Sequence, residues 1–109
     1  MALTEKIIFT TTIAAAAAIT KKRFVNFFGG PAGASDATLG VANADYDPGE
    51  LAGVDVQGEI VVEAGAAVAV GAQVQSDAQG RAITLGSGVA AGRARDAAVA
   101  AGDYIRVLR

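Results

Sequence analysis

Short apolar segments, each closed by a glycine, follow one another along most of this chain and limit the folds open to it. Residues 61–74 read Val-Val-Glu-Ala-Gly-Ala-Ala-Val-Ala-Val-Gly-Ala-Gln-Val, and a similar pattern returns in residues 92–107. Glycine adopts positive φ without steric cost, so each glycine marks a place where the chain can turn sharply. The β-branched residues between the turns favour extended strands. The pattern therefore predicts a compact β module whose surface carries its role.

The positions of the expected strands follow from this pattern. They are residues 7–13, 24–28, 39–42, 51–56, 59–62, 82–85 and 104–108. Asp47-Pro48-Gly49-Glu50 suits a type II turn, and residues 29–36, which are rich in Gly and Pro, predict an exposed loop. The alanine-rich stretches 14–18 and 96–101 allow at most one helical turn each, because so few residues cannot sustain an isolated helix.

The two halves of the sequence contain an internal echo. Ala17-Ala18-Ile19 followed by Val25 matches Ala66-Ala67-Val68 followed by Val74, 49 positions later (66 − 17 and 74 − 25). Gly40-Val41-Ala42 has a looser counterpart in Gly92-Arg93-Ala94. Such an echo indicates two related β units with pseudo-twofold symmetry, whereas a chain rich in Ala, Gly and Val also matches itself by chance. Both interpretations remain open from the sequence.

Size and composition limit the stability that one copy can reach. A chain of 109 residues forms one domain with one core. Aromatic residues make up only 6% of it, so the core is built from Ala, Val, Ile and Leu, whose small side chains each bury little apolar area. Conformational entropy opposes this gain at about 1–2 kcal/mol per residue. We therefore expect an oligomer or a larger assembly to supply the remaining stability.

The charged and reactive residues exclude several classes of function. The net charge is −2, and Lys21-Lys22-Arg23 is the one basic cluster, which argues against a general nucleic-acid binder. Histidine and cysteine are both absent, so the commonest general base, nucleophile and soft metal ligands are missing together. We predict no catalytic residue, no metal site and no cofactor.

Two segments have an alternative chemical interpretation. Asp45, Asp47 and Glu50 carry enough carboxylates for a hard cation such as Ca²⁺, but acidic residues in turns usually cap backbone amides or face water. Residues 63–74 resemble the turn and strand of biotinyl and lipoyl carrier domains, which attach their cofactor to an exposed hairpin lysine. The lysines of this chain all precede that segment, so carrier function is not expected; they are Lys6, Lys21 and Lys22.

The uncharged stretch 7–20 superficially imitates the apolar core of a signal peptide. It includes several threonines and leads directly into Lys21-Lys22-Arg23. A stretch of this length and polarity is too short to cross about 30 Å of hydrocarbon. We expect neither a targeting nor a transmembrane segment, and no membrane partner.

The order of these packing and turn segments resembles that of the small head-decoration proteins of tailed bacteriophages, also called capsid cement proteins. The resemblance covers about residues 13–107. It is carried by Ala17-Ala18-Ile19 with Phe24-Val25, residues 39–42, 65–68 and 71–80, Ala91-Gly92-Arg93-Ala94 and Gly102-Asp103-Tyr104-Ile105-Arg106-Val107. It implies a mainly β, single-domain module, sandwich- or barrel-like (of the β-tulip type), with an extended N-terminal arm and at most one or two short helical turns.

The resemblance also implies a role and partners. The role is that of a structural, non-enzymatic virion protein, made in the cytoplasm of the bacterial host. Such a protein binds the major capsid protein on the outer surface of the assembled shell and reinforces the shell against internal DNA pressure. It is often a homotrimer, and neither nucleic acid nor membrane is a partner.

Two groups of apolar residues are the candidate contacts with the capsid or with another subunit. Residues 1–12 are expected to form an N-terminal arm ahead of the decoration domain (residues 13–109), with Ile7, Ile8 and Phe9 as apolar anchors. Alternation along a strand at 24–28 places Phe24 and Phe28 on one face and Phe27 on the other, so one face is available to a trimer interface. The competing interpretation places all three phenylalanines in the core of their own domain.

Two other classes of function stay open. The first is a β module of another phage assembly, such as a tail or spike component, or an adhesion module. The second is an accessory domain of an enzyme or carrier, against which the missing histidines and phosphate-loop residues weigh. Binding to expanded, DNA-filled heads rather than to tail tubes separates a decoration protein from the first class.

Overall fold

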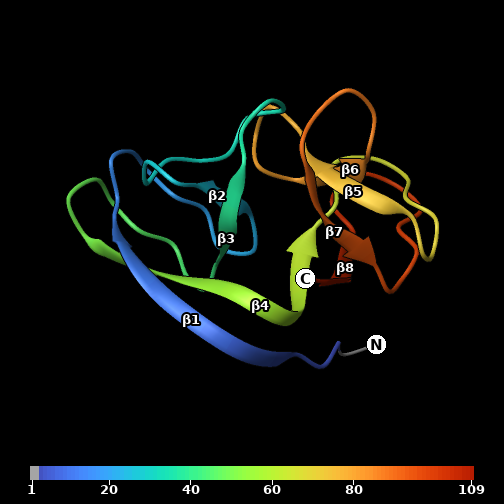
Figure 1. The fold of residues 1–109 in the computed structure, drawn as a ribbon, viewed down its shortest axis with the longest axis horizontal. Helices are drawn as coiled ribbons and strands as arrows, with labels where there is room; N and C mark the ends of the chain where they lie inside the picture. Colours follow the sequence, from blue (N-terminus) through green and yellow to red (C-terminus); the bar gives the residue numbers. More distant parts are fainter. Residues whose placement is uncertain (1–2) are drawn as a thin grey trace.

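The computed structural model describes residues 3–109, and their regular secondary structure consists of β-strands alone (Figure 1). The strands are β1 (Lys6–Ala14), β2 (Phe24–Asn26), β3 (Thr38–Ala42), β4 (Leu51–Glu63), β5 (Gln73–Ser76), β6 (Ala82–Thr84), β7 (Ala90–Ala94) and β8 (Tyr104–Leu108). They form one antiparallel sheet in the order β2-β3-β4-β8-β7-β5-β6, and β1 pairs with β4 outside this path. The sheet curls into a nearly closed, barrel-like module, which confirms the predicted mainly β fold.

The sheet contains two units of the same design, so the internal echo reflects a structural repeat. In the first unit β1 pairs with the first part of β4, as the last part of β4 pairs with β8 in the second unit. β2 pairs with β3 as β5 pairs with β7, and a register shift occurs at the same step of both pairs. Corresponding pairs are Ile13↔Ala52 with Val62↔Ile105, Phe24↔Val41 with Gln73↔Arg93, and Ile19↔Tyr46 with Val68↔Ala98.

Strand β4 belongs to both units and crosses from one to the other (Figure 1). The sequence predicts two strands separated at Gly58, but the structure has one continuous strand of 13 residues. Pairing with β1 along its first part and with β8 along its last part explains this continuity. Gly58 lies at the crossing with φ +129°, and a Cβ atom there would lie 2.2 Å from the carbonyl oxygen of Lys6. Glycine is therefore required where β1 lies against β4.

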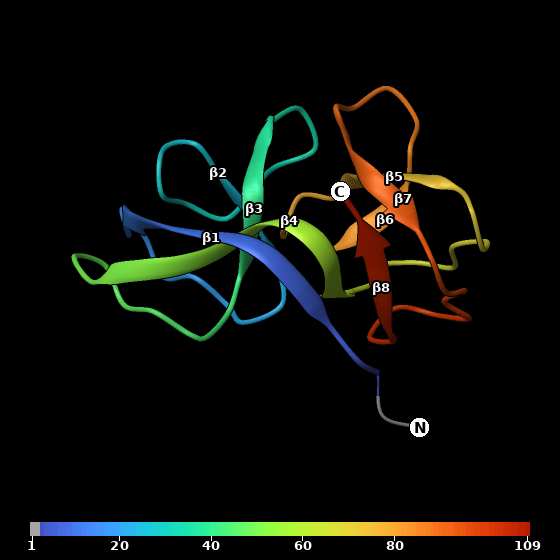
Figure 2. The same cartoon turned by 60° about the horizontal axis from the view of Figure 1, so that its bottom comes forward.

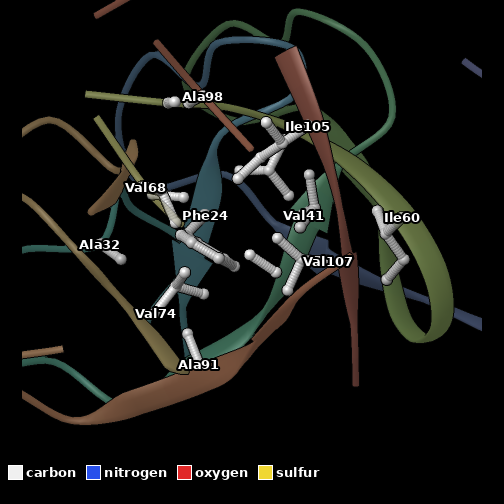
Figure 3. Close-up of a cluster of buried hydrophobic side chains, with 14 residues drawn as sticks. Phe24, Ala32, Val41, Ile60, Val68, Val74, Ala91, Ala98, Ile105 and Val107 are labelled. Carbon is white, nitrogen blue, oxygen red and sulfur yellow. The ribbon is translucent and has the colours of Figure 1, made fainter. Parts of the chain in front are cut away.

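Two clusters of buried apolar side chains form the core. The larger cluster surrounds Phe24, which is fully buried among aliphatic side chains from both units (Figure 3). The smaller cluster belongs to the first unit and contains Ala15, Ile19, Val25, Ala42, Ala52 and Val54. Apart from Phe24, the buried apolar residues of the described chain are Ala, Val and Ile. The core therefore has the small-residue character that the composition predicts, without a buried leucine.

Arg109 connects the two units at their junction. Its guanidinium donates hydrogen bonds to the carbonyl oxygens of Val56 (2.8 Å), Thr38 (3.0 Å) and Ala91 (3.1 Å). The same group lies 5.9 Å from the centre of the Phe24 ring, within the range of a cation–π contact. Burial lowers the pKa of Arg109 from its ordinary value. One side chain thus holds strands from both units against the main core.

Long-range hydrogen bonds determine the conformation of several segments for which the local sequence allowed more than one structure. Neither alanine-rich stretch contains a helical turn, and the amide of Ala15 instead donates to the carbonyl oxygen of Glu50 (2.8 Å). The predicted strand at 24–28 ends at Asn26. The loop 29–36, predicted to be exposed, lies partly over the core, because Ala32 is fully buried.

The predicted type II turn is confirmed. Gly49 has φ +92°, and the amide of Glu50 donates to the carbonyl oxygen of Asp47 (3.2 Å). The described chain has no helix of the length and apolarity that a membrane crossing requires.

Candidate functional site

The structure divides the six predicted contact residues into buried and exposed ones. Phe24 is fully buried and Ile7 packs partly against the main core. The other four are exposed, with Ile8 at 68% and Phe28 at 85%. Phe24 therefore occupies the core position that the competing interpretation assigns to it. The exposed apolar side chains from the two groups are Ile8, Phe9, Phe27 and Phe28.

Most of the segment predicted as an N-terminal arm lies in the sheet. β1 pairs with β4 from Lys6↔Glu59 onward, and residues 1–2 lie outside the described part of the chain. Just before β1, the Glu5 carboxylate accepts hydrogen bonds from the amide of Val61 (2.9 Å) and the ammonium of Lys22 (2.6 Å). The described part of the segment is thus fixed along β4, and β1 forms an outer margin of the sheet (Figure 2).

A β-bulge in β1 exposes two successive apolar side chains. Ile7 is paired with Gly58 and Phe9 with Gln57, so Ile8 is an extra residue of β1. In a regular strand, one of two neighbouring side chains turns inward. A bulge breaks this alternation and re-aims a side chain. Ile8 and Phe9 are therefore both exposed, while Ile7 remains against the core.

The turn that carries Phe27 and Phe28 is held by the side chain of Asn26. Its amide oxygen accepts hydrogen bonds from the backbone amides of Phe28 (2.9 Å) and Gly30 (3.0 Å). The side-chain amide of Asn26 also donates to Asp36 (3.2 Å). Side chains that compete for backbone amides in this way end strands and build turns. The sequence prediction of alternating faces fails here because the strand stops before either phenylalanine.

Asp36 extends this network into the following loop. Its carboxylate accepts a hydrogen bond from the backbone amide of Gly33 (2.8 Å) as well as from Asn26. The hydrogen bond from Gly33 makes the larger contribution, and together with the bond from Asn26 it holds the pKa of Asp36 below its ordinary value. The hydrogen bonds to Asn26 and Asp36 therefore restrict the backbone of this turn.

The second unit contains the same turn without aromatic residues. In residues 77–81, the carboxylate of Asp77 accepts hydrogen bonds from the amides two and four positions later (2.8 and 2.9 Å), as the side chain does in residues 26–30. Phe27-Phe28 therefore corresponds to Ala78-Gln79. Because one backbone design folds with either pair, the phenylalanines are not needed to form the turn.

Leu51 of β4 is a further exposed apolar side chain, which the sequence did not indicate. Leu51 lies opposite Ala14, at the end of β1, and is exposed. Its neighbour Ala52 is fully buried, so strand alternation from the buried alanine would have placed Leu51 outside. The small size of Ala52 hides this signal in the sequence.

One hollow of the described surface has a volume of about 790 Å³ and lies between Leu3, Val61, the loop 96–103 and Tyr104. Lys22 at its wall is paired with Glu5. In the loop, the carboxylate of Asp103 accepts hydrogen bonds from two backbone amides (2.8 and 3.2 Å). These charged groups stabilise the surrounding chain, so the hollow offers little unpaired charge to a ligand.

Asp96 and Arg106 form an ion pair at the same hollow. The carboxylate of Asp96 accepts hydrogen bonds from the guanidinium Nε (2.8 Å) and Nη2 (2.8 Å) and from the backbone amide of Arg106 (2.9 Å). The side-chain bonds to Arg106 lower the pKa of Asp96 to about 2. The same pair raises the pKa of Arg106.

Two of the three carboxylates with the alternative cation interpretation accept hydrogen bonds from backbone amides. Asp45 accepts a hydrogen bond from the amide of Lys21 (2.7 Å), and Glu50 accepts one from the amide of Asp47 (2.6 Å). Within residues 3–109, no three potential metal-ligating side chains gather in one place. Asp45 and Glu50 thus adopt the capping role that the turn pattern favours, and the Asp47 side chain is exposed.

The described chain is thus a small all-β module that presents apolar side chains on a bulge and on a turn held by side-chain hydrogen bonds. Comparison with known families identifies it further. The family model for phage cement protein matches residues 3–109, and the chain belongs to this family. The fold is similar to that of the head fiber gp8.5 N base in bacteriophage phi29, with a TM-score of 0.72 and 20% sequence identity over 92% of each chain. No curated protein matches the sequence.

Proposed function

We propose that this chain decorates the outer surface of an assembled phage capsid and stabilises the capsid against the pressure of packaged DNA. Its membership of the phage cement protein family over residues 3–109 carries the proposal. The described surface supports it, because rigidly held apolar side chains suit repeated contact with many identical partners. Many weak contacts on one lattice add to a large avidity.

The proposed form on the capsid is a homo-oligomer, specifically a trimer. A core of small side chains buries little apolar area per residue, so contacts between subunits would supply further buried area. A trimer also presents three copies of each docking residue to a symmetric shell. Light scattering should give about three times the chain mass of 10.8 kDa. A monomer at micromolar concentration would contradict this part of the proposal.

The proposed contacts are the residues exposed on the bulge and on the turn. Ile8 and Phe9 form one apolar group and Phe27 with Phe28 the other, and Ile7 supports the bulge from the core side. Buried aromatic anchors supply much of the binding energy of protein interfaces. Phe24 stays within the core in this proposal.

The capsid role is tested with purified particles. Expanded phage heads that lack this protein are mixed with it, sedimented and assayed for bound protein, with tail tubes as the matched control. We expect saturable binding to heads and a higher temperature of DNA release from the decorated heads. Binding to tail tubes alone, or decorated heads that release DNA at an unchanged temperature, would contradict the proposal.

The turn of residues 26–30, called the phenylalanine turn here, is tested by exchanging Phe27 and Phe28 with the equivalent residues of the turn 77–81. The double substitution Phe27→Ala and Phe28→Gln copies the residues of the second unit, so we expect unchanged thermal stability and at least a tenfold weaker affinity for heads. The reverse pair, Ala78→Phe and Gln79→Phe, controls for general stickiness and should leave the affinity unchanged. Equal affinity of the first variant and the wild type would remove this turn from the contact.

A further inference from the structure

We infer that the outer edge of β1 is a docking element of its own, which accepts an extended segment of the shell protein as an added β-strand. This inference rests on the proposed function and specifies the chemistry of the partner. The partner supplies backbone N–H and C=O groups, in the manner of strand addition at an open sheet edge.

The pairing register shows where the backbone groups of Thr12 point. The carbonyl oxygen of Gly53 accepts a hydrogen bond from the amide of Asn43 (3.1 Å), on the side of β4 away from β1. In an antiparallel pair, the N–H and C=O of one residue point to the same edge, and opposed residues either both bond or both point away. Thr12 lies opposite Gly53. Its own N–H and C=O therefore point outward from the sheet.

Thr10 has the same orientation. It lies opposite Asp55, and a Cβ atom at Gly40 of β3 would lie 2.3 Å from the carbonyl oxygen of Asp55. The backbone groups of Asp55 thus face β3, so those of Thr10 face outward. In the described chain β1 pairs with no strand other than β4 (Figures 1 and 2). Thr10 and Thr12 together offer two donors and two acceptors along this edge.

The two proposed apolar groups flank this open stretch. At one end, the phenylalanine turn blocks the backbone of Ala14, because a Cβ atom on Gly29 would lie 2.2 Å from the carbonyl oxygen of Ala14 and the amide of Ala16 donates to the carbonyl oxygen of Gly29 (2.9 Å). At the other end, the bulge presents Ile8 and Phe9. A strand added at Thr10 and Thr12 therefore lies between two groups of exposed apolar side chains, which its own side chains can cover.

The second unit shows how such an edge is satisfied when a partner is present. The last part of β4 is the counterpart of β1, and its outward amides at Val61 and Glu63 correspond to those of Thr12 and Ala14. The amide of Val61 donates to the carboxylate of Glu5 (2.9 Å), and the amide of Glu63 donates to the carbonyl oxygen of Lys22 (2.8 Å). The chain itself thus closes this edge in one unit, and leaves the edge at Thr10 and Thr12 open in the other.

The geometry favours a segment of the shell protein over a second copy of this chain. Two β1 strands paired antiparallel about Thr10, Thr11 or Thr12 would place a residue of the second copy opposite Ala14. The phenylalanine turn already occupies that position, since a Cβ atom on Gly29 would lie 2.2 Å from the carbonyl oxygen of Ala14. A short extended segment fits between the turn and the bulge without this clash.

Amide hydrogen exchange of the wild-type protein tests the inference directly. The protein is labelled free and bound to heads, then quenched, released and analysed by mass spectrometry of peptides covering residues 9–13. We expect at least tenfold slower exchange at Thr10 and Thr12 on heads. Bound protein with unchanged exchange at these amides would overturn the inference and leave the proposed function standing. Protection that develops in the free protein as its concentration rises would assign the edge to a second copy and also overturn it.

A proline substitution provides the matching binding test. Thr12→Pro removes an outward N–H, which an edge strand tolerates, and Thr12→Val keeps that N–H as the control. We expect at least tenfold weaker binding to heads for the proline variant and wild-type binding for the valine variant. Equal loss in both variants, or loss in neither, would contradict strand addition. Failure of the wild type to bind heads would instead refute the proposed function itself.

Discussion

At the scale of single residues, acidic side chains hold the connections of this module in place. Asp36, Asp77 and Asp103 each accept hydrogen bonds from backbone amides of their own loops. This role is predictable as a class, because carboxylates in turns commonly cap amides. The distant partners are not predictable, since the sequence gives no sign that Asp45 lies against the amide of Lys21.

The ion pair of Asp96 with Arg106 stabilises the folded protein at neutral pH and loses this effect in acid. The pKa of Asp96 is about 2 in the folded chain and 3.8 ordinarily, so its contribution is present above pH 4 and is lost as the pH falls towards 2. We expect Asp96→Asn to lower the free energy of unfolding by about 1 kcal/mol at pH 7, the upper end for a surface ion pair. Urea unfolding at pH 7 and pH 2 measures this, and the difference should nearly vanish at pH 2.

Asp47→Asn is the control for this pH dependence. The Asp47 side chain is exposed and accepts no hydrogen bond from the described residues. We expect its substitution to change the unfolding free energy little at either pH. An Asp96→Asn variant with the same pH profile as the wild type would show that the pair does not contribute in solution.

At the scale of the elements, the sequence predicts best where local preference and tertiary pairing agree. The strand at 104–108 is correct in both bounds, because its alternating apolar residues match a half-buried strand. The strand at 24–28 is too long, since the side chain of Asn26 captures amides that a strand would have used. The bulge at Ile8 leaves no mark in the sequence, because it arises from pairing with residues near Gly58. The register therefore determines which of the three predicted anchors are exposed, namely Ile8 and Phe9 but not Ile7.

The close approach of β1 to β4 depends on Gly58. In Gly58→Ala, the added Cβ would meet the backbone of β1, and the residue would be held at positive φ. We expect a loss of about 2–5 kcal/mol in the free energy of unfolding, combining steric overlap and backbone strain. Chemical denaturation gives the value.

Gly102→Ala separates the two contributions to this loss. Gly102 has φ +93°, and no heavy atom outside its chain neighbours lies within 4 Å of the position that a Cβ would occupy. Only the backbone strain of about 1–2 kcal/mol is therefore expected. Equal losses for the two variants would mean that β1 shifts away from β4 without cost.

At the scale of the whole molecule, the repeat and its shared strand predict a single unfolding transition. Tyr46 belongs to the first unit and Tyr104 to the second, and they are the only two tyrosines in the chain. β4 passes through both units, and Arg109 bonds to both. Neither unit can therefore lose its structure while the other keeps its own.

Two single-tyrosine variants test this cooperativity. Tyr104→Phe leaves Tyr46 as the fluorescent probe, and Tyr46→Phe leaves Tyr104. In urea, the fluorescence midpoint of each variant should coincide with the midpoint of its own far-UV circular dichroism. A fluorescence midpoint displaced from the circular dichroism midpoint in either variant would show that the units unfold separately.

The equivalence of the turns 26–30 and 77–81 has a consequence for how the sequence of such a protein can vary. Because Ala78-Gln79 shows that this loop shape forms without large side chains, residues 27 and 28 are free to vary with little penalty to folding. In the proposed contact with the capsid, the affinity for the shell can therefore change through these two residues while the fold stays constant. Members of the family adapted to different hosts should differ there before they differ in the interior.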